Sequence, residues 1–261
     1  ALSQAGVSLV ITVDCGITAR EEADYAAALG LDLVITDHHE CKDALPAAVA
    51  AVDPCRPVCP YPFKQLAGVG VALKLALALT PEAARPQVWS AYADLAAIGT
   101  IADVMEMTGE NRTIVSFGLQ ALQTGPLRPG LAALLHEAGL FGKSITAATV
   151  SYGLAPRINA AGRMGHADLA VDLLLTASRV GAEEAARALC DLNRLRQSTE
   201  LAIYEECLSR IGPTLSSGQH ALVLSDETWH QGVVGIVASR LVEQYHCPVF
   251  MICLQGDKGK G

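Results

Sequence analysis

Five side chains in the first half of the sequence have the chemistry to hold divalent metal ions. Asp37, His38 and His39 follow one another directly after an apolar run, and Asp14 follows an earlier run of the same kind. Asp103 follows a stretch rich in Ala and Gly, where backbone segments can approach closely. Carboxylate oxygens with one imidazole suit Mn²⁺ or Mg²⁺ better than a metal that prefers thiolates. The sequence therefore predicts a metal site, on condition that these segments converge.

Each of the five residues also has an ordinary structural explanation. A single aspartate is more often a helix cap or a turn former, so Asp14 and Asp103 gain meaning only through convergence. Asp37-His38-His39 is the sharper signal, because three consecutive titratable groups at the end of a strand are rarely needed for packing. An aspartate that bridges two ions about 3.5–4 Å apart would allow phosphoryl hydrolysis. Two ions need more ligands than Asp14, His38 and Asp103 supply, so a complete dinuclear site requires further residues.

The elements expected to position these residues are two parallel strands. Residues 9–13 and 31–36 are apolar, rich in β-branched side chains, and separated by a helical pattern. A strand–helix–strand order predicts a right-handed crossover between parallel strands. The carboxyl ends of both strands then lie at one edge of the sheet, which is where open α/β sheets bind ligands. We therefore expect an α/β fold with a doubly wound parallel sheet, helices on both faces, and Asp14 beside Asp37.

The remaining elements follow from caps, periodicity and chain breaks. Thr18 with Glu21 three residues later predicts a capping box at the start of the first helix. A charge-rich helical pattern over 182–211 is long for a core helix and predicts a connection between domains. A strand is expected at 49–52, helices at 68–79, 88–101, 112–122 and 128–138, and a strand–helix–strand order at 221–224, 233–245 and 249–254.

A second group of residues has side chains suited to a phosphate chain. Arg157, Asn159 and Arg163 lie between Gly153 and Gly165, in a stretch that we interpret as a turn. No carboxylate lies between the two arginines, and guanidinium groups fork onto phosphate oxygens. A solvated turn without a ligand is the alternative.

Two other stretches leave alternatives open. Gly68-Val69-Gly70 opens a predicted helix, and it either presents N–H groups to an anion or allows close helix packing. Trp229 and His230 precede another predicted helix, where the indole is either a stacking platform for a base or a buried anchor. Burial in the folded chain decides both.

The composition excludes several classes of protein. The 261 residues are 51% hydrophobic and 5% aromatic, as in a globular chain whose core is built from aliphatic side chains. A net charge of −8 argues against coating of nucleic acid by bulk attraction, so a polyanion would be bound locally. No apolar run approaches about eighteen residues and no basic segment precedes an apolar one, so we expect a cytoplasmic protein without a membrane span.

The eight cysteines are scattered along the chain. They do not form the dense framework of a small secreted domain, so we expect reduced thiols. Cys41, Cys55 and Cys59 lie near one another in sequence and offer a zinc site as an alternative. No second closely spaced pair accompanies Cys55 and Cys59, so zinc is the weaker choice.

Six motifs together make the chain similar to a known family. They are Val13-Asp14-Cys15-Gly16, Asp37-His38-His39, and the segments GTIADV at 99–104, GENR at 109–112, RINAAGR at 157–163 and WHQGVVGIVA at 229–238. The combination resembles the single-stranded-DNA exonuclease branch of the DHH phosphoesterase superfamily over nearly the whole chain. The DHH triplet alone indicates only the superfamily, whereas the segments at 157–163 and 229–238 indicate the nuclease branch.

The resemblance implies a role for each candidate residue. Asp14 would bridge two Mn²⁺ or Mg²⁺ ions, and His38 and Asp103 would complete one of them. The catalytic residues would be Asp37, which would orient His38, and His39, which would contact the scissile phosphate. The substrate-binding residues would be Arg157, Asn159, Arg163, Trp229 and His230.

The same resemblance implies the domain order, the reaction and the partners. We expect a DHH domain over 1–181, a connecting helix over 182–212 and the start of a smaller α/β DHHA1 domain over 213–261. Nucleotides would be removed processively from the 5′ end of single-stranded DNA in recombination and repair, by a monomer that works with a RecQ-type helicase and a single-strand-binding protein. The alternatives are a DHH phosphodiesterase that acts on short oligonucleotides or cyclic dinucleotides, and an inactive scaffold that binds single-stranded DNA.

Two motifs of the family lack a counterpart. An aspartate-rich segment is expected ahead of Val13, but only twelve residues precede it and none is acidic. The glycine- and serine-rich motif that closes the DHHA1 domain is also missing. We therefore expect an internal portion of a longer protein, which by itself binds the first metal poorly.

Overall fold

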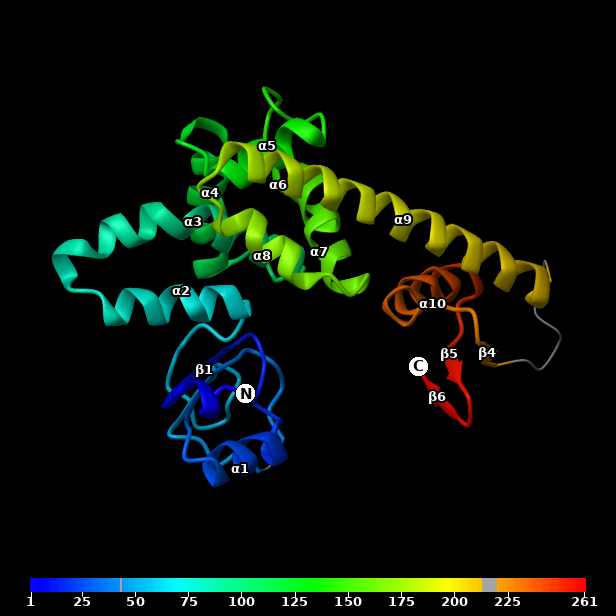
Figure 1. Cartoon of the computed structure of the whole chain (residues 1–261), viewed down its shortest axis with the longest axis horizontal. Coiled ribbons are helices and arrows are strands. Elements are labelled where there is room, and N and C mark those ends of the chain that lie inside the picture. The colour runs from blue at the N-terminus through cyan, green and yellow to red at the C-terminus, as the bar shows by residue number, and fades with distance from the viewer. Residues whose placement is uncertain (43, 213–219) are drawn as a thin grey trace. The chain divides into compact units, whose positions relative to one another are not determined.

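The computed structural model describes residues 1–42, 44–212 and 220–261 of the chain. Pro213, where the last domain is expected to begin, lies outside these residues. The described residues form two three-stranded sheets, one near each end of the chain, and a series of helices lies between them in sequence (Figure 1). The predicted α/β class is therefore confirmed.

The chain divides into two compact units. The first unit comprises residues 1–127 and 142–155, and the second comprises 128–141 and 156–261. This division does not coincide with the expected domain limits after residues 181 and 212. Those limits, and the assignment of the last segment to a DHHA1 domain, stay predictions.

The sheet of the first unit positions the DHH triplet. β1 (Leu9–Val13), β2 (Asp32–Thr36) and β3 (Ala50–Val52) are parallel and adjacent in that order, and their limits are close to those predicted. Their β-branched side chains suit a pleated surface covered by helices. β1 and β2 end in register, and the N–H of Asp14 extends the ladder to Thr36 O at 2.9 Å. The polar residues that follow both strands therefore meet at one edge.

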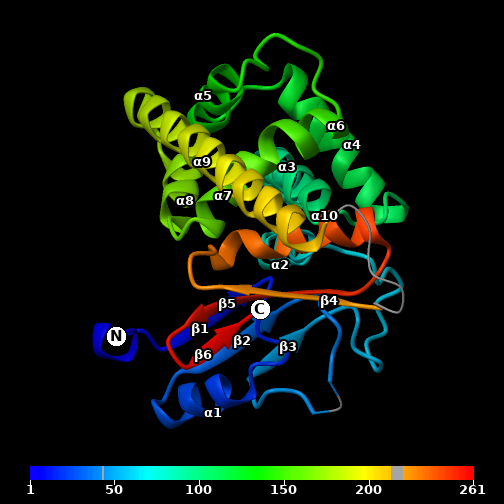
Figure 2. The same cartoon turned by 90° about the vertical axis from the view of Figure 1, so that its right-hand side faces the viewer.

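A helix lies on each side of this sheet, but the β1 side chains Leu9, Ile11 and Val13 on one face are still 44–52% exposed. α1 (Arg20–Ala28) lies on one side and α2 (Gly68–Leu79) on the other (Figure 2). α3 (Arg85–Ala102) packs against α2 and against α4 (Gly109–Thr124). The short turns of this unit are η1 (Ser3–Ala5), η2 (Glu82–Ala84), α6 (Ala147–Thr149) and a π-helical turn, η3 (Val150–Leu154).

The predicted capping box at the start of α1 is wrong. α1 begins at Arg20, Ala19 is its N-cap, and no side chain caps it. The residues before it form a turn, in which the N–H of Ile17 donates to the Asp37 carboxylate at 2.9 Å. Thr18 is held in this turn ahead of the helix, so its hydroxyl does not reach the first free N–H groups.

The second unit is built on one long helix. α9 (Arg179–Ile211) spans the segment that the charge pattern predicts to be a connecting helix. Its N-cap is Ser178, whose hydroxyl accepts the N–H of Gly181 at 3.2 Å. α5 (Pro129–Glu137) and α8 (Ala167–Leu175) pack against α9.

A smaller sheet follows α9. The predicted strand–helix–strand order is confirmed as β4 (Leu222–Asp226), α10 (Gln231–Tyr245) and β5 (Val249–Gln255), and the two strands are parallel. β6 (Lys258–Lys260) adds an antiparallel strand that the sequence does not indicate, because Lys and Gly give no strand pattern. The core between these elements contains Ile203, Cys207, Val233, Val237, Leu241 and Met251.

The turn predicted between Gly153 and Gly165 is wrong. These residues form α7 (Ala155–Arg163), which directly follows the π-helical turn η3. Alanine has the highest helix propensity, and the side chains of Ala160 and Ala161 are fully buried. The two glycines that suggest a turn both lie outside α7.

Two expectations from the composition can be compared with the fold. None of the helices in the described part of the chain has the length and the apolarity needed to cross a membrane. All eight cysteines are free, as expected for reduced thiols.

Gly118→Ala tests the close packing of α4 on α3. A Cβ on Gly118 would overlap Ala97 Cβ and lie 3.0 Å from the carbonyl carbon of Ala93, so we expect a loss of about 1–3 kcal/mol in the free energy of unfolding. Gly235→Ala in α10 is the matched control, because nothing lies within 4 Å of the added atom. Its higher helix propensity should stabilise the chain by up to about 1 kcal/mol. Differential scanning calorimetry measures both, and shifts of the same sign and size would contradict the packing.

Candidate metal centre

Three side chains from separate segments meet at the carboxyl edge of the first sheet. His38 follows β2, and its Nε2 lies 3.0 Å from Asp14 Oδ1 and 3.4 Å from Asp103 Oδ2. Asp14 follows β1, and Asp103 is the C-cap of α3. The two carboxylates are about half exposed, whereas the His38 side chain is only 8% exposed. The structure thus brings together Asp14, His38 and Asp103, the three residues predicted to bind metal.

The Nε2 atom of His38 is a buried polar atom with no hydrogen bond among the described residues. It lies within ion-pair distance of two carboxylates, but neither contact has hydrogen-bond geometry. A buried polar atom left in this state costs about 1–3 kcal/mol. A nitrogen directed between two carboxylates therefore fits a bound cation better than a packed core. The ligand atoms of Asp14, His38 and His39 lie within 4.8 Å of one another, which is compatible with one shared ion.

The backbone is strained at Asp14 and at the residue after Asp103. Asp14 has a φ of 63°, in the left-handed region that residues other than glycine rarely adopt. Val104, next to Asp103, has a φ of 55°. Such residues cost about 1–3 kcal/mol each and persist only where the surrounding structure fixes them. The strand ladder fixes the backbone of Asp14, and the N–H of Asp103 is bound to Gly99 O at 3.0 Å.

Asp37 organises the triplet from inside the fold. Its buried carboxylate accepts the N–H groups of Ile17 at 2.9 Å, His38 at 2.8 Å and His39 at 3.3 Å, and it binds Nδ1 of the His39 ring at 2.6 Å. Burial by itself would raise the pKa of Asp37, but these hydrogen bonds outweigh burial and leave the pKa below its usual value. The structure therefore differs from the resemblance, because Asp37 orients the ring of His39 and not that of His38.

His39 presents an accessible ring next to His38. Its side chain is 59% exposed, and the two ring centres lie 4.5 Å apart. The hydrogen bond that its Nδ1–H donates to the Asp37 carboxylate raises the pKa of His39, which favours the imidazolium form. Because Nδ1 is engaged by Asp37, Nε2 is the ring atom left for a ligand.

Two thiols contact the backbone of the triplet. Cys55 Sγ lies 3.2 Å from His38 O, and Cys41 Sγ lies 3.9 Å from His39 O. Burial raises the pKa of both thiols, that of Cys41 to about 11, so they remain protonated donors. Within the described ranges, the cysteines belong to no group of three side chains that could hold a metal ion. The zinc alternative therefore has no geometric support.

The three residues predicted to bind phosphate do not share one face. Asn159 and Arg163 lie one turn apart on α7 and are exposed, whereas Arg157 projects in another direction and is half-buried. Arg163 Nη1 donates to Gly232 O at 3.3 Å. A Cβ on Gly232 would lie 2.8 Å from the carbonyl carbon of Arg163, so α7 ends directly against the start of α10. Two of the family motifs are thereby joined.

Trp229 is a buried anchor. It is 5% exposed, its Nε1 donates to Glu206 Oε2 at 2.9 Å, and the Arg210 guanidinium lies 5.3 Å from the ring centre. A ring this deeply buried offers no face to a base, which corrects its expected role in substrate binding. His230 is the N-cap of α10, where its Nδ1 accepts the N–H of Gly232 at 3.1 Å.

Sequence reasoning missed several contributors to these sites. Cys41 and Cys55 carry no pattern that links them to the triplet, because their partners are backbone carbonyls. Glu206 lies far from Trp229 in sequence, and only its charge marks it as a partner. The Gly-Val-Gly spacing draws attention to Gly68, but nothing in the sequence shows that Gly68 lies against Asp14 of the metal centre.

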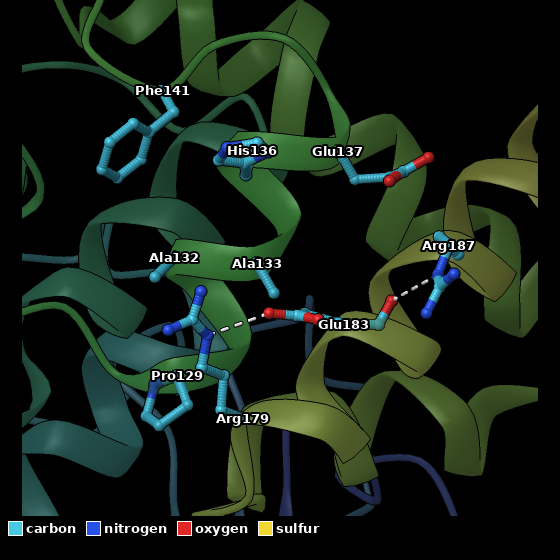
Figure 3. A pocket seen from close by; sticks show the side chains of 9 residues that line it. All are labelled: Pro129, Ala132, Ala133, His136, Glu137, Phe141, Arg179, Glu183 and Arg187. Carbon is cyan, nitrogen blue, oxygen red and sulfur yellow. Dashed lines mark hydrogen bonds and ion pairs between the residues drawn. The ribbon is translucent and has the colours of Figure 1, made fainter.

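A pocket of about 630 Å³ lies in the second unit, between α5 and α9 (Figure 3). Ala132, His136 and Phe141 line one side, and Arg179 forms an ion pair with Glu183 on the other. None of the predicted site residues lines this pocket. It therefore stands apart from the chemistry described above.

The chain matches known proteins over nearly all of its length. Residues 3–100 match the model of the DHH family, N-terminal domain. The single-stranded-DNA-specific exonuclease RecJ of Bacillus subtilis (strain 168) is 43% identical over 258 residues, which cover 99% of this chain and 32% of that protein. Its counterpart in Escherichia coli (strain K12) is 38% identical over 276 residues, which cover 98% and 47%. The chain thus spans about a third to a half of the length of these curated relatives.

Two solved structures share the fold. A crystal structure of exonuclease RecJ bound to manganese is 37% identical with a TM-score of 0.83, and the match covers 96% of this chain and 63% of that one. A crystal structure of RecJ from Thermus thermophilus in complex with Mn²⁺ is 36% identical with a TM-score of 0.85, over 97% and 38% of the two chains. The helices and strands described above therefore match a part of the fold of each of these two proteins.

Asp37→Asn tests the buried carboxylate as a hydrogen-bond acceptor. The amide of the Asp37→Asn variant would turn an NH₂ group toward N–H donors that now bind the carboxylate oxygens. We therefore expect the free energy of unfolding at neutral pH to fall by about 2 kcal/mol or more. Because the pKa of Asp37 is lowered by folding, its contribution is present above the unfolded value of about 4 and is lost as the pH falls through the lower folded value. Urea titrations across this pH range should show that the difference in free energy of unfolding between Asp37→Asn and the unsubstituted protein becomes smaller in acid. A difference that does not change with pH would contradict this account.

Proposed function

We propose that the chain hydrolyses phosphodiester bonds of single-stranded DNA from the 5′ end with divalent metal ions. This proposal follows from its homology to the RecJ proteins and from its DHH-family domain. The observation that carries the proposal is the buried Nε2 of His38 between the carboxylates of Asp14 and Asp103. Oxygen ligands with one imidazole form the donor set that suits Mn²⁺ and Mg²⁺. The substrate, the polarity and the partners of the whole polypeptide are part of this proposal.

Asp14, His38 and Asp103 would hold one ion, and Asp14 would extend to a second. When bound, such ions lower the pKa of water and offset negative charge on a phosphate. Asp14 suits a bridging position because one oxygen lies against His38 while 59% of its side chain is exposed. The strained backbone of Asp14 supports this assignment, since strain is retained where a precise position has a function.

His39 would contact the scissile phosphate. Asp37 holds the ring by Nδ1, so the opposite nitrogen is turned to a ligand in a fixed orientation. The raised pKa favours a charged ring, which would stabilise the negative charge that develops on the phosphate. Asp37 is thus a positioning residue for His39, and it also keeps the backbone of the triplet in place.

Asn159 and Arg163 would bind backbone phosphates of the strand, with Arg157 as a further cation on the same helix. The exposed face shared by Asn159 and Arg163 supports this assignment. His230 would act by fixing the start of α10 beside Arg163, through its bond to Gly232 N–H. A helicase that exposes single strands, and a protein that coats them, are the partners such an activity needs.

The alternatives differ in what they require of the metal centre. An inactive scaffold would lose folding stability by keeping a buried imidazole without a hydrogen bond between two carboxylates, and it would gain no function from it. A phosphodiesterase for short oligonucleotides would need the same metal centre, so only the preferred length of substrate separates it from the exonuclease.

His38→Ala and Asp103→Ala test the metal centre and the activity together. In the full-length polypeptide we expect each variant to bind Mn²⁺ at least about tenfold more weakly and to lose cleavage of a long 5′-phosphorylated single strand. Calorimetry and release of labelled nucleotides measure the two effects. Asp191→Ala on α9 is the control, because this exposed aspartate pairs with Arg194 on the surface.

Undiminished cleavage by His38→Ala would remove the metal assignment. If the unsubstituted protein turned over a dinucleotide faster than the long strand, the short-substrate phosphodiesterase would replace the exonuclease. Binding of the long strand without Mn²⁺ uptake or cleavage would instead support the scaffold.

Arg163→Ala tests the phosphate-binding face of α7. Each phosphate contact releases counterions, so the variant should bind single-stranded DNA more weakly and lower the slope of log affinity against log salt by about 1. Arg179→Ala is the charge-matched control, because Arg179 is 91% exposed and pairs with Glu183 on α9. Fluorescence anisotropy at several salt concentrations gives both slopes. Equal slopes for the two variants would count against Arg163.

A further inference from the structure

The first turn of α2 touches both carboxylate-bearing segments of the metal centre. Gly68 is the first residue of α2 and lies against Asp14, while the next residue, Val69, lies against Gly99 of α3. Gly99 stands one helical turn before Asp103. Both contacts leave no room for one more carbon atom.

Gly68 forms a wall behind the Asp14 side chain. A Cβ at this position would lie 2.5 Å from Asp14 Cγ and 2.6 Å from Asp14 Cβ, distances that real Cβ atoms do not adopt. The φ of Gly68 is compatible with any residue, so backbone freedom does not explain the glycine. No hydrogen bond to the Asp14 carboxylate occurs in the described parts of the chain, and its known polar contact is His38 Nε2. Close packing by α2 therefore restricts where this carboxylate lies.

Val69 limits the position of the segment that carries Asp103, the other carboxylate. A Cβ on Gly99 would lie 2.7 Å from Val69 Cγ1 and 3.1 Å from Val69 Cβ, so α3 approaches α2 as closely as a glycine allows. The carbonyl of Gly99 accepts the N–H of Asp103 at 3.0 Å. The position of Asp103 relative to His38 therefore depends on how closely α3 lies against Val69.

α2 is itself held firmly. Lys74 forms an ion pair with Glu110 of α4, and Glu110 also accepts the hydroxyl of Tyr61 at 2.5 Å. Val71 and Leu73 of α2 are buried in the core with Ile114 of α4. A helix fixed in this way can act as a rigid spacer at its first turn.

We propose that Gly68 and Val69 are positioning residues of the metal centre, which set the separation of Asp14 and Asp103 on either side of His38 Nε2. This inference rests on the proposed metal-dependent function and adds to it the element that spaces the ligands. Ligand spacing decides affinity for Mn²⁺ and Mg²⁺, because these ions keep a near-octahedral shell of oxygen ligands.

Gly68→Ala gives the direct test. The added methyl group must displace the Asp14 carboxylate, so we expect Mn²⁺ to bind at least about tenfold more weakly by calorimetry. The electron paramagnetic resonance spectrum of bound Mn²⁺ should change, while the melting temperature of the metal-free protein stays close to that of the unsubstituted chain. Gly181→Ala is the matched control, because it also lies in the first turn of a helix but has its nearest neighbour at 3.4 Å.

A second pair of variants tests the same spacing from the side of α3. Gly99→Ala should also weaken Mn²⁺ binding, because its methyl group meets Val69. Val69→Ala combined with Gly99→Ala removes the obstructing methyl groups and should restore most of the affinity. This pair decides the question if Gly68→Ala does not fold.

The outcomes separate the inference from the function on which it rests. Mn²⁺ affinity unchanged in both Gly68→Ala and Gly99→Ala would overturn the positioning and leave the metal centre intact. Failure of the double variant to recover affinity would also overturn it. Absence of Mn²⁺ binding by the unsubstituted full-length polypeptide, in which all these variants are compared, would overturn the metal centre and the positioning with it.

Discussion

A buried imidazole nitrogen between two carboxylates is the constraint on which the rest of the site depends. His38 Nε2 has lost its water and forms no hydrogen bond with the described residues, although Asp14 and Asp103 lie at 3.0 and 3.4 Å. Such an atom raises the free energy of the fold unless a cation or a proton joins it to the carboxylates. The parallel register of β1 and β2 and the end of α3 bring these three side chains together. The fold thus places these three ligands where a bound cation would lower its free energy.

The structure stabilises this arrangement through contacts that are not themselves ligands. Asp37 uses four hydrogen bonds to tie the end of β2 to the turn before α1 and to the ring of His39. Two thiols approach the carbonyls of the triplet, and the first turn of α2 presses on Asp14 through Gly68. In the second unit, close contact at Gly232 likewise joins α7 to α10. In each case, hydrogen bonds and close packing from residues that are not ligands themselves fix the position of the polar groups.

The sequence was sufficient for elements with strong local patterns and insufficient where tertiary contacts decide. The strands β1 to β5 and the helices α2, α9 and α10 follow from apolar runs, charge and glycine positions. The convergence of Asp14 with His38 follows from strand order. Thr18 is not a cap because Ile17 is bound by Asp37, a partner distant in sequence. The segment 155–163 forms a helix because buried alanines outweigh the flanking glycines. No local pattern could show that Trp229 is buried against Glu206, or that the compact units divide where they do.

The central claim concerns the ion that lies beside His38. The most direct measurement is anomalous diffraction at the manganese absorption edge, from crystals grown with Mn²⁺. The account predicts a peak within about 2.0–2.6 Å of His38 Nε2 and of oxygens of both Asp14 and Asp103. A peak elsewhere in the chain, or fully occupied Mn²⁺ sites that leave His38 Nε2 without a ligand bond, would contradict it.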